Sequence, residues 1–175
     1  MKPLTSSQFL KAVWPQKLLT HETLELRVID RVTQRIHRKF ATSIPEFLSH
    51  AQKYADFEVY FGVSTRFMQG GKKENCYRVN TVWVDLDNKK LSECLFDPKP
   101  NILVESGGGI HAYWVFESPV LVKDERWGPI ENINRGLAKA FGGDIAAIDV
   151  SRILRCPQFL NHKYSPARPV KAYAL

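Results

Sequence analysis

Two aspartates separated by one residue end an apolar run near the middle of the chain. Residues 81–87 read Thr-Val-Trp-Val-Asp-Leu-Asp, and the two acids are Asp85 and Asp87. Side chains alternate along a β-strand, so both carboxylates would project from the same face. Neighbouring carboxylates repel unless cations lie beside them, and paired hard cations are the usual means of transferring phosphoryl groups. A strand that ends in a polar turn is the alternative, because Asp-x-Asp alone is a weak motif.

A second segment combines three consecutive glycines with a histidine. Residues 105–116 read Glu-Ser-Gly-Gly-Gly-Ile-His-Ala-Tyr-Trp-Val-Phe. Consecutive glycines let the backbone approach a ligand and expose its amides, which suits phosphate, although a tight hairpin also explains them. The residues that follow alternate, so His111 and Tyr113 share the less apolar face of a strand. A lone histidine in a strand is more often structural, but its place directly after this turn favours contact with a ligand.

A third segment, residues 149–163, threads charged side chains through apolar positions. Asp149 is followed by Arg152, Arg155 and Lys163. One arginine guanidinium can bind two phosphate oxygens at once, and lysine adds a point charge. A surface ion pair between Asp149 and Arg152 is the alternative, although exposed pairs typically contribute below about 1 kcal/mol. The three segments together favour a functional site.

In this order the segments resemble the three motifs of the archaeo-eukaryotic primase superfamily, in particular the primase-polymerase branch of plasmids, phages and mobile elements. Asp85 and Asp87 match the first motif, and residues 106–111 match the Ser-Gly-x-Gly-x-His hairpin of the second. The third motif is an aspartate followed by an Arg-x-Pro-x-x-x-Asn-x-Lys-like run, matched by Asp149, Arg155, Pro157, Asn161 and Lys163. The similarity covers residues 57–170. One departure is Gln158, where relatives commonly have glycine.

The resemblance implies a role for each matched residue. The three acids Asp85, Asp87 and Asp149 would be catalytic and would bind two divalent ions, Mg²⁺ or Mn²⁺. Zinc is not expected, because the chain has no cluster of thiolates or imidazoles. Seven further residues would bind the nucleotide, with the tyrosine against its sugar: Ser106, His111, Arg152, Arg155, Asn161, Lys163 and Tyr113.

The implied enzyme is a template-directed nucleotidyltransferase, a DNA primase-polymerase that extends, and could initiate, chains from ribonucleoside or deoxyribonucleoside triphosphates. Its partners would be a single-stranded DNA template and a primer, with a helicase or an accessory primase domain as a further partner. Two carboxylate-held ions suit this chemistry, which needs a deprotonated 3′-hydroxyl and a neutralised triphosphate. A two-metal nuclease or phosphodiesterase would need the same acids but no triphosphate pocket. A non-catalytic module that binds single-stranded nucleic acid is the third hypothesis.

Composition agrees with this reading. The chain has 175 residues, 44% of them hydrophobic and 25% charged, as in ordinary globular proteins. A net charge of +7 favours polyanionic partners. The three cysteines are scattered, which indicates a reducing compartment. No apolar run approaches the roughly twenty residues of a membrane span and no signal-peptide pattern is present, so we expect a cytoplasmic protein without a membrane partner.

We expect an α+β fold in which residues 1–175 form one catalytic core. An N-terminal α/β lobe and a C-terminal lobe with a sheet like that of an RNA-recognition motif would flank a central cleft. Residues 27–40 are rich in basic side chains, and in a helix Arg31, Arg35 and Arg38 would lie near one face. That face is either solvated surface or a ridge along the template backbone. Helices are predicted over residues 8–14, 44–54 and 129–141, and strands over residues 22–30, 57–63, 77–87, 102–105, 110–116 and from 169.

Overall fold

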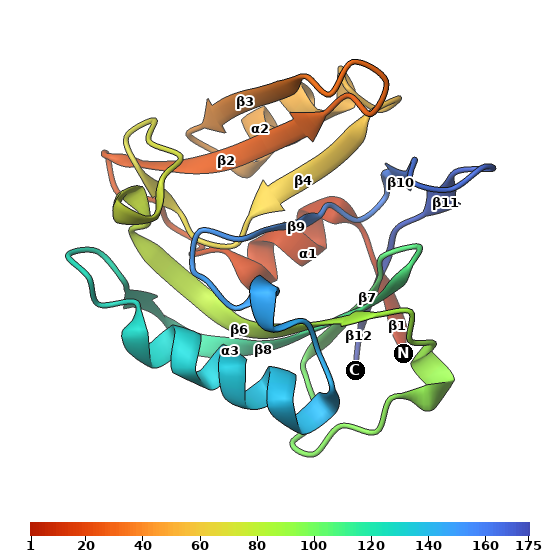
Figure 1. Ribbon diagram of the computed structural model, residues 1–175. Helices are drawn as coiled ribbons and strands as arrows, with labels where there is room; N and C mark the ends of the chain where they lie inside the picture. Colours follow the sequence, from red (N-terminus) through yellow and green to blue (C-terminus); the bar gives the residue numbers. More distant parts are fainter.

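Two antiparallel sheets face each other across the molecule in the computed structural model, which describes all 175 residues. Figure 1 shows the upper sheet with strand order β3-β2-β4-β9, and the lower sheet with order β1-β12-β7-β8-β6. The upper strands are β2 (Glu22–Ile29), β3 (Ile36–Ala41), β4 (Glu58–Gly62) and β9 (Ile153–Arg155), with β5 (Arg66–Phe67) paired to β2. The lower strands are β1 (Lys2–Leu4), β6 (Arg78–Asp87), β7 (Ile102–Glu105), β8 (Gly109–Leu121) and β12 (Lys171–Ala174).

Three α-helices cover these sheets, and local sequence explains where each begins or ends. Helix α1 (Ser6–Val13) lies between the sheets and starts with a capping box at Thr5. Helix α2 (Ile44–Gln52) packs on β2 and begins at Ser43, whose side chain accepts the Glu46 amide. Helix α3 (Gly128–Phe141) packs under β6 and ends at Gly142 in the left-handed conformation. None of the helices is long and apolar enough to cross a membrane.

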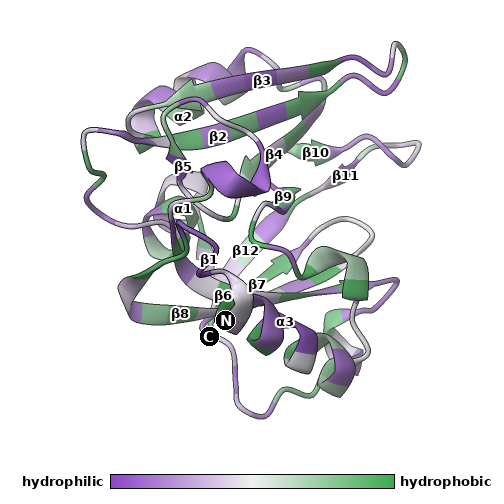
Figure 2. Ribbon diagram, turned by 60° about the vertical axis from the view of Figure 1, so that its left-hand side comes forward, coloured by the Kyte–Doolittle hydropathy of each residue, from purple (hydrophilic) through white to green (hydrophobic).

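The main hydrophobic core fills the space between the two sheets. It contains 28 buried residues, including Phe9 and Trp14 from the α1 region, Phe61 from β4 and Tyr113 from β8. A second cluster of six residues, among them Val84, lies between the lower sheet and α3. Figure 2 shows many hydrophilic residues along β3 and on α3, the elements at the outer surfaces. The cores therefore fix the positions of the two sheets and of α3 relative to one another.

The predicted α+β fold is confirmed, and most predicted elements are present. The three helices and the strands β2, β4, β6, β7 and β8 lie where expected, with β8 extending to Leu121. Short strands β9 and β10 (Leu160–Asn161) within the third motif were not predicted, and the strand expected from residue 169 is divided into β11 (Arg168–Pro169) and β12. Three 3₁₀ turns complete the chain: η1 (Lys73–Asn75), η2 (Leu91–Glu93) and η3 (Ile145–Ala147).

Two features of the chain's organisation were left open by the sequence. The basic segment is not helical: it forms the β2–β3 hairpin, in which Arg38 pairs with Glu25 and Arg31 lies 3.7 Å from Glu58. The lobes are also not consecutive halves of the chain, because the first strand, β1, lies in the lower sheet and the late strand β9 in the upper. Long-range strand pairing of this kind leaves no local sequence signal.

Candidate active site

Strands β6 and β8 place two of the predicted motifs side by side. In their antiparallel register Asp85 lies opposite His111, and Asp87 lies opposite Gly109. A side chain at Gly109 would come within 2.2 Å of the Leu86 carbonyl oxygen, so only glycine permits this close pairing. The expected alternation is confirmed, because Val84 and Leu86 pack into the cluster beneath the sheet while the aspartates face the cleft.

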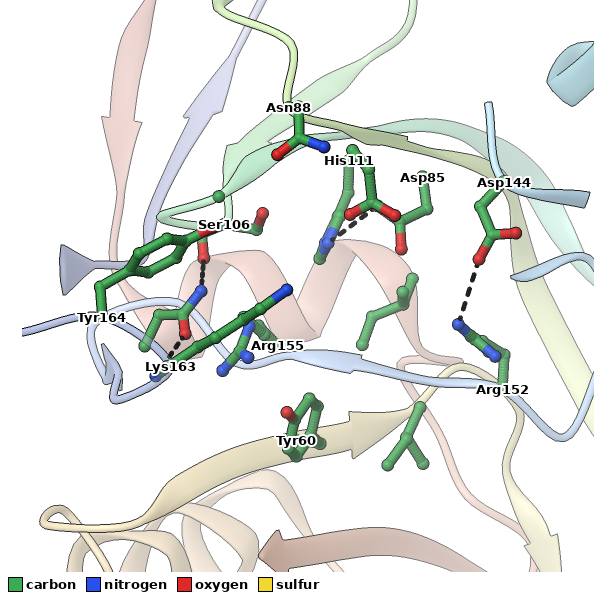
Figure 3. Close-up of a pocket in the computed structure, with 15 residues that line it drawn as sticks. Tyr60, Asp85, Asn88, Ser106, His111, Asp144, Arg152, Arg155, Lys163 and Tyr164 are labelled. Atoms are coloured by element: carbon green, nitrogen blue, oxygen red, sulfur yellow. Dashed lines mark hydrogen bonds and ion pairs between the residues drawn. The ribbon is translucent and has the colours of Figure 1, made fainter. Parts of the chain in front are cut away.

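A polar pocket of about 270 Å³ opens above these strands, between the lower sheet and strands β4 and β9. Figure 3 shows its lining, with Asp85 and Asp144 toward one side and Ser106, Lys163 and Tyr164 toward the other. Most of the residues predicted from the sequence line this pocket: Asp85, Asp87, Ser106, His111, Arg152, Arg155, Asn161 and Lys163. Two predicted residues, Asp149 and Tyr113, do not.

Asp149 lies outside the pocket, contrary to the sequence prediction. Its carboxylate accepts hydrogen bonds from the Ser151 amide, at 3.1 Å, and from the Ser151 hydroxyl. Its carbonyl accepts the Arg152 amide, so that Asp149 closes the turn leading into β9. Short aspartate side chains commonly cap turns in this way. The late acid of the predicted triad is therefore engaged in local structure.

Asp144, which the sequence analysis did not select, lines the pocket. Its amide donates to the Asp85 carbonyl at 2.8 Å, and its side chain lines the pocket. This approach depends on Gly143, where a Cβ would lie 2.3 Å from the Val84 side chain and 2.9 Å from the Asp85 carbonyl oxygen. The Asp144 carboxylate caps η3 through the Ala146 amide and lies 3.6 Å from Arg152. Three carboxylates, those of Asp85, Asp87 and Asp144, thus line one pocket.

Tyr113 is also displaced from its predicted role. Its side chain is fully buried and packs edge-on against Phe9 of α1, so it cannot contact a nucleotide sugar. Its hydroxyl lies 3.2 Å from Nδ1 of His111. Burial raises the pKa of Tyr113 well above its usual value, so the hydroxyl keeps its proton. The other ring nitrogen, Nε2, lies 3.6 Å from the Asp85 carboxylate, so we assign the imidazole proton to Nε2 and let Nδ1 accept the hydrogen bond from the hydroxyl.

Burial and like charge both disfavour ionisation among these side chains. The pKa of Asp85 is raised, chiefly by burial and further by Asp87 and Asp144, while His111 and Arg152 act in the opposite direction. Burial also lowers the pKa of His111, so its imidazole is neutral at pH 7. A cation in the pocket would relieve the repulsion between the carboxylates.

The wall opposite the acids supplies positive charge. Arg155 of β9 pairs with the buried Glu58 of β4, and its guanidinium lies 5.0 Å from the centre of the Tyr60 ring. Burial lowers the pKa of Arg155 to about 10, which leaves it charged at neutral pH. Lys163 is exposed at the rim and forms no ion pair within the chain.

The side chain of Asn161 forms hydrogen bonds with the chain itself, at the glycine turn and at Lys163. Its amide donates to the Ser106 carbonyl at 2.8 Å, and its carbonyl oxygen accepts the Lys163 amide at 3.0 Å. The Ser106 hydroxyl donates to the Gly109 carbonyl at 3.1 Å and can still accept a hydrogen bond. These contacts hold the glycine turn and the strand that carries Lys163 together.

The donor set suits Mg²⁺ or Mn²⁺ better than zinc, because it consists of carboxylates with a single imidazole. No three of the chain's Asp, Glu, His or Cys side chains are grouped so as to hold one ion by themselves. Mg²⁺ is commonly held by one or two carboxylates together with water and substrate phosphates, and this pocket fits that mode.

Sequence reasoning missed four polar side chains in the lining: Tyr60, Asn88, Asp144 and Tyr164. Only Asp144 had a usable signal, the Gly-Gly-Asp run directly after a helix end. Tyr60 and Tyr164 enter the pocket through long-range packing of β4 and of the β10–β11 hairpin, which local pattern does not report.

Known proteins share both sequence and fold with this chain. Residues 71–172 match the RepB DNA-primase N-terminal domain family. A replication protein of Clostridium perfringens is 28% identical over 123 residues, which is 62% of this chain and 30% of that protein. The chain thus spans less than a third of the length of that relative.

Two solved structures have a similar fold. The AEP domain of the cyanophage S-2L primase-polymerase aligns with a TM-score of 0.65 at 21% identity, over 86% of this chain and 80% of that one. The catalytic domain of primase RepB′ in complex with initiator DNA aligns with a TM-score of 0.57 at 20% identity, over 85% and 74%. The expected resemblance to archaeo-eukaryotic primases is confirmed. Because the family match covers more than half of its residues, the chain belongs to the RepB DNA-primase N-terminal domain family.

Proposed function

We propose that this chain is the catalytic core of a DNA primase-polymerase, a nucleotidyltransferase that acts on a primed single-stranded DNA template. One observation carries the proposal: Asp85, Asp87 and Asp144 line the same pocket as His111 and three basic side chains, Arg152, Arg155 and Lys163. Family membership and the similarity to a primase solved with initiator DNA support it. Residues 1–175 would act together, because both sheets contribute to the pocket.

The three acids would hold Mg²⁺ or Mn²⁺ together with the nucleotide's phosphates. Bound ions would lower the pKa of the primer's 3′-hydroxyl and neutralise charge on the triphosphate. Asp85 and Asp87 present their carboxylates from one strand, and Asp144 presents the third from beyond α3. We assign to Asp144 the role that the sequence had suggested for Asp149.

The triphosphate would extend from the acids toward Ser106 and Lys163. His111 donates through Nε2 to a phosphate oxygen, and Lys163 adds charge from the rim. Arg155 is oriented by Glu58 and Tyr60 before the nucleotide arrives, which reduces the entropy lost on binding. Asn161 would hold the Ser106 backbone in place, and Tyr113 would hold the His111 ring.

The basic wall favours this function over a two-metal nuclease. A nuclease needs the acids but has no use for several cations that converge beside them to hold a triphosphate. Arg155 and Lys163 line the same pocket as the acids, so the cavity can accept an anionic group longer than one phosphodiester.

Primer extension on a DNA template tests the proposal. The native chain is compared with the Asp85→Asn, Asp87→Asn double variant in Mg²⁺ or Mn²⁺, with ribonucleotides and deoxyribonucleotides supplied separately. We expect extension by the native chain and a loss of about a thousandfold or more in the variant. Equal extension by both proteins would reject the site. Degradation of DNA without added nucleotide would favour the nuclease.

A further inference from the structure

A second groove continues the active-site pocket beyond the glycine turn. It has a volume of about 780 Å³, against about 270 Å³ for the pocket itself. Its walls are the β7–β8 turn, the segment after β6 and the β10–β11 hairpin. Asn88, Gly108 and Tyr164 line both cavities, so the groove lies directly beside the pocket. Figure 3 shows Tyr164 at the end of the pocket opposite Asp144.

The groove is strongly basic. Lys89, Lys90, Arg168 and Lys171 line it, and none of them forms an ion pair within the chain. Its only acid, Glu105, accepts a hydrogen bond from Tyr173 at 3.0 Å. Unpaired cations in a concave wall focus positive potential on the space between them. The groove therefore suits a polyanion.

Arg168 is held in place at the junction of the two cavities. It donates to the Gly107 carbonyl at 3.1 Å, and its guanidinium lies 3.7 Å from the centre of the Tyr164 ring. Gly107 has a φ of +80°, and a Cβ there would lie 3.0 Å from Arg168 and from Asn161. One hydrogen bond uses only one of the five donors of the guanidinium, so the others remain available to phosphate.

The proposed orientation of the triphosphate indicates which strand would reach this groove. In phosphoryl transfer the attacking hydroxyl and the leaving pyrophosphate lie roughly in line on opposite sides of the phosphorus. The acids lie at one end of the pocket and Ser106 and Lys163 at the other. If the triphosphate extends from the acids toward Ser106 and Lys163, as proposed above, the primer end approaches from the Asp144 side. The groove lies beyond the triphosphate, on the side away from the copied duplex.

We propose that this groove binds the sugar-phosphate backbone of the uncopied, single-stranded template ahead of the growing end. This inference rests on the proposed function. Pyrophosphate alone would not need cations spread over the segment after β6, the β10–β11 hairpin and β12. A strand that tracks several phosphates uses all of them, and Tyr164 offers a face to a base at the entrance.

The test measures binding to primed templates whose unpaired template overhang is either one nucleotide or about eight nucleotides, within the usual site size of single-strand-binding folds. Fluorescence anisotropy with the intact chain gives the dissociation constant without catalysis. The variant is the triple substitution Lys89→Ala, Lys90→Ala, Lys171→Ala. The control is Lys11→Ala, Lys17→Ala, Lys139→Ala, which removes the same charge from exposed positions outside both cavities.

We expect the groove variant to bind the long-overhang substrate at least about tenfold more weakly, with the slope of log K against log salt reduced by about 2. For the one-nucleotide overhang, the groove variant and the control variant should have the same affinity. The control variant should lose the same small amount of affinity for both substrates. Lys89→Glu, Lys90→Glu, confined to an exposed segment, provides a second variant and should weaken the same substrate further.

Three results would overturn the inference: equal weakening on both overhangs, no weakening on either, or a raised KM for the nucleotide with unchanged DNA affinity. The last would assign the groove to the triphosphate. Absence of extension by the native chain would reject the proposed function, yet the overhang-dependent binding would still be measured. The two failures are therefore distinguishable.

Discussion

The two sheets differ in whether their buried carboxylates have a cationic partner within the chain. Glu25 and Glu58 are almost fully buried and pair with arginines, Glu25 with Arg66 and Glu58 with Arg155. Asp85, by contrast, has only a neutral histidine 3.6 Å away. Paired carboxylates hold arginines in place, whereas unpaired carboxylates in a pocket are available to external cations. The upper sheet therefore orients positive charge, and the lower sheet leaves negative charge unsatisfied.

The largest expected effect separates Asp144 from Asp149. We expect Asp144→Asn to lower the extension rate about a thousandfold, because the pocket loses one of three carboxylates. Asp149→Asn keeps a turn-capping side chain outside the pocket and should change the rate less than about threefold. Single-turnover extension measures both. A severe loss in the Asp149 variant alone would restore the triad read from the sequence.

Removing the acid that orients Arg155 should have the next largest effect. Glu58→Gln leaves the partly buried guanidinium without its counter-ion and should lower the free energy of unfolding by about 2–3 kcal/mol. The KM for the nucleotide should rise about tenfold or more, because Arg155 is no longer pre-oriented. Thermal unfolding and steady-state kinetics measure these changes. Adding Arg155→Gln to the Glu58→Gln variant should raise the KM for the nucleotide only a little further, because both changes act on the same guanidinium. If the two effects on KM simply add, Glu58 does not act through Arg155.

Tyr113→Phe should produce a smaller loss. Phenylalanine keeps the packing against Phe9 but removes the hydrogen bond to Nδ1 of His111. Loss of about 1 kcal/mol corresponds to a rate reduction of roughly fivefold. Nitrogen NMR of labelled histidine, with His111→Gln to assign the signal, should show a change from the Nε2–H tautomer to a mixture. An unchanged tautomer would contradict the positioning role.

Metal binding should produce the smallest effect, on stability alone. At about ten times its dissociation constant, Mg²⁺ would add about 1.4 kcal/mol, or roughly 3–5 °C in melting temperature. The shift should be absent in the Asp85→Asn, Asp87→Asn variant. A shift of the same size in both proteins, measured by differential scanning calorimetry, would place the ion elsewhere.

Sequence pattern was enough to identify the two motifs that lie on paired strands. Alternation placed Asp85 and His111 on cleft-facing positions of β6 and β8, and the glycines predicted the turn between β7 and β8. Capping residues located the helices, because Thr5, Ser43 and Gly142 act within one turn of the chain. Local periodicity and capping depend on neighbours in sequence, so both can be predicted without coordinates.

The choice of the third acid was decided by tertiary structure. Asp144 enters the pocket because Gly143 lets the chain pass against the Asp85 carbonyl, while Asp149 turns back to Ser151. Tyr113 was equally ambiguous, since only the packing of α1 between the sheets buries it. Both outcomes depend on contacts between segments far apart in the chain. Spacing along the sequence names the residues that can do the chemistry, but three-dimensional packing selects which of them face the substrate.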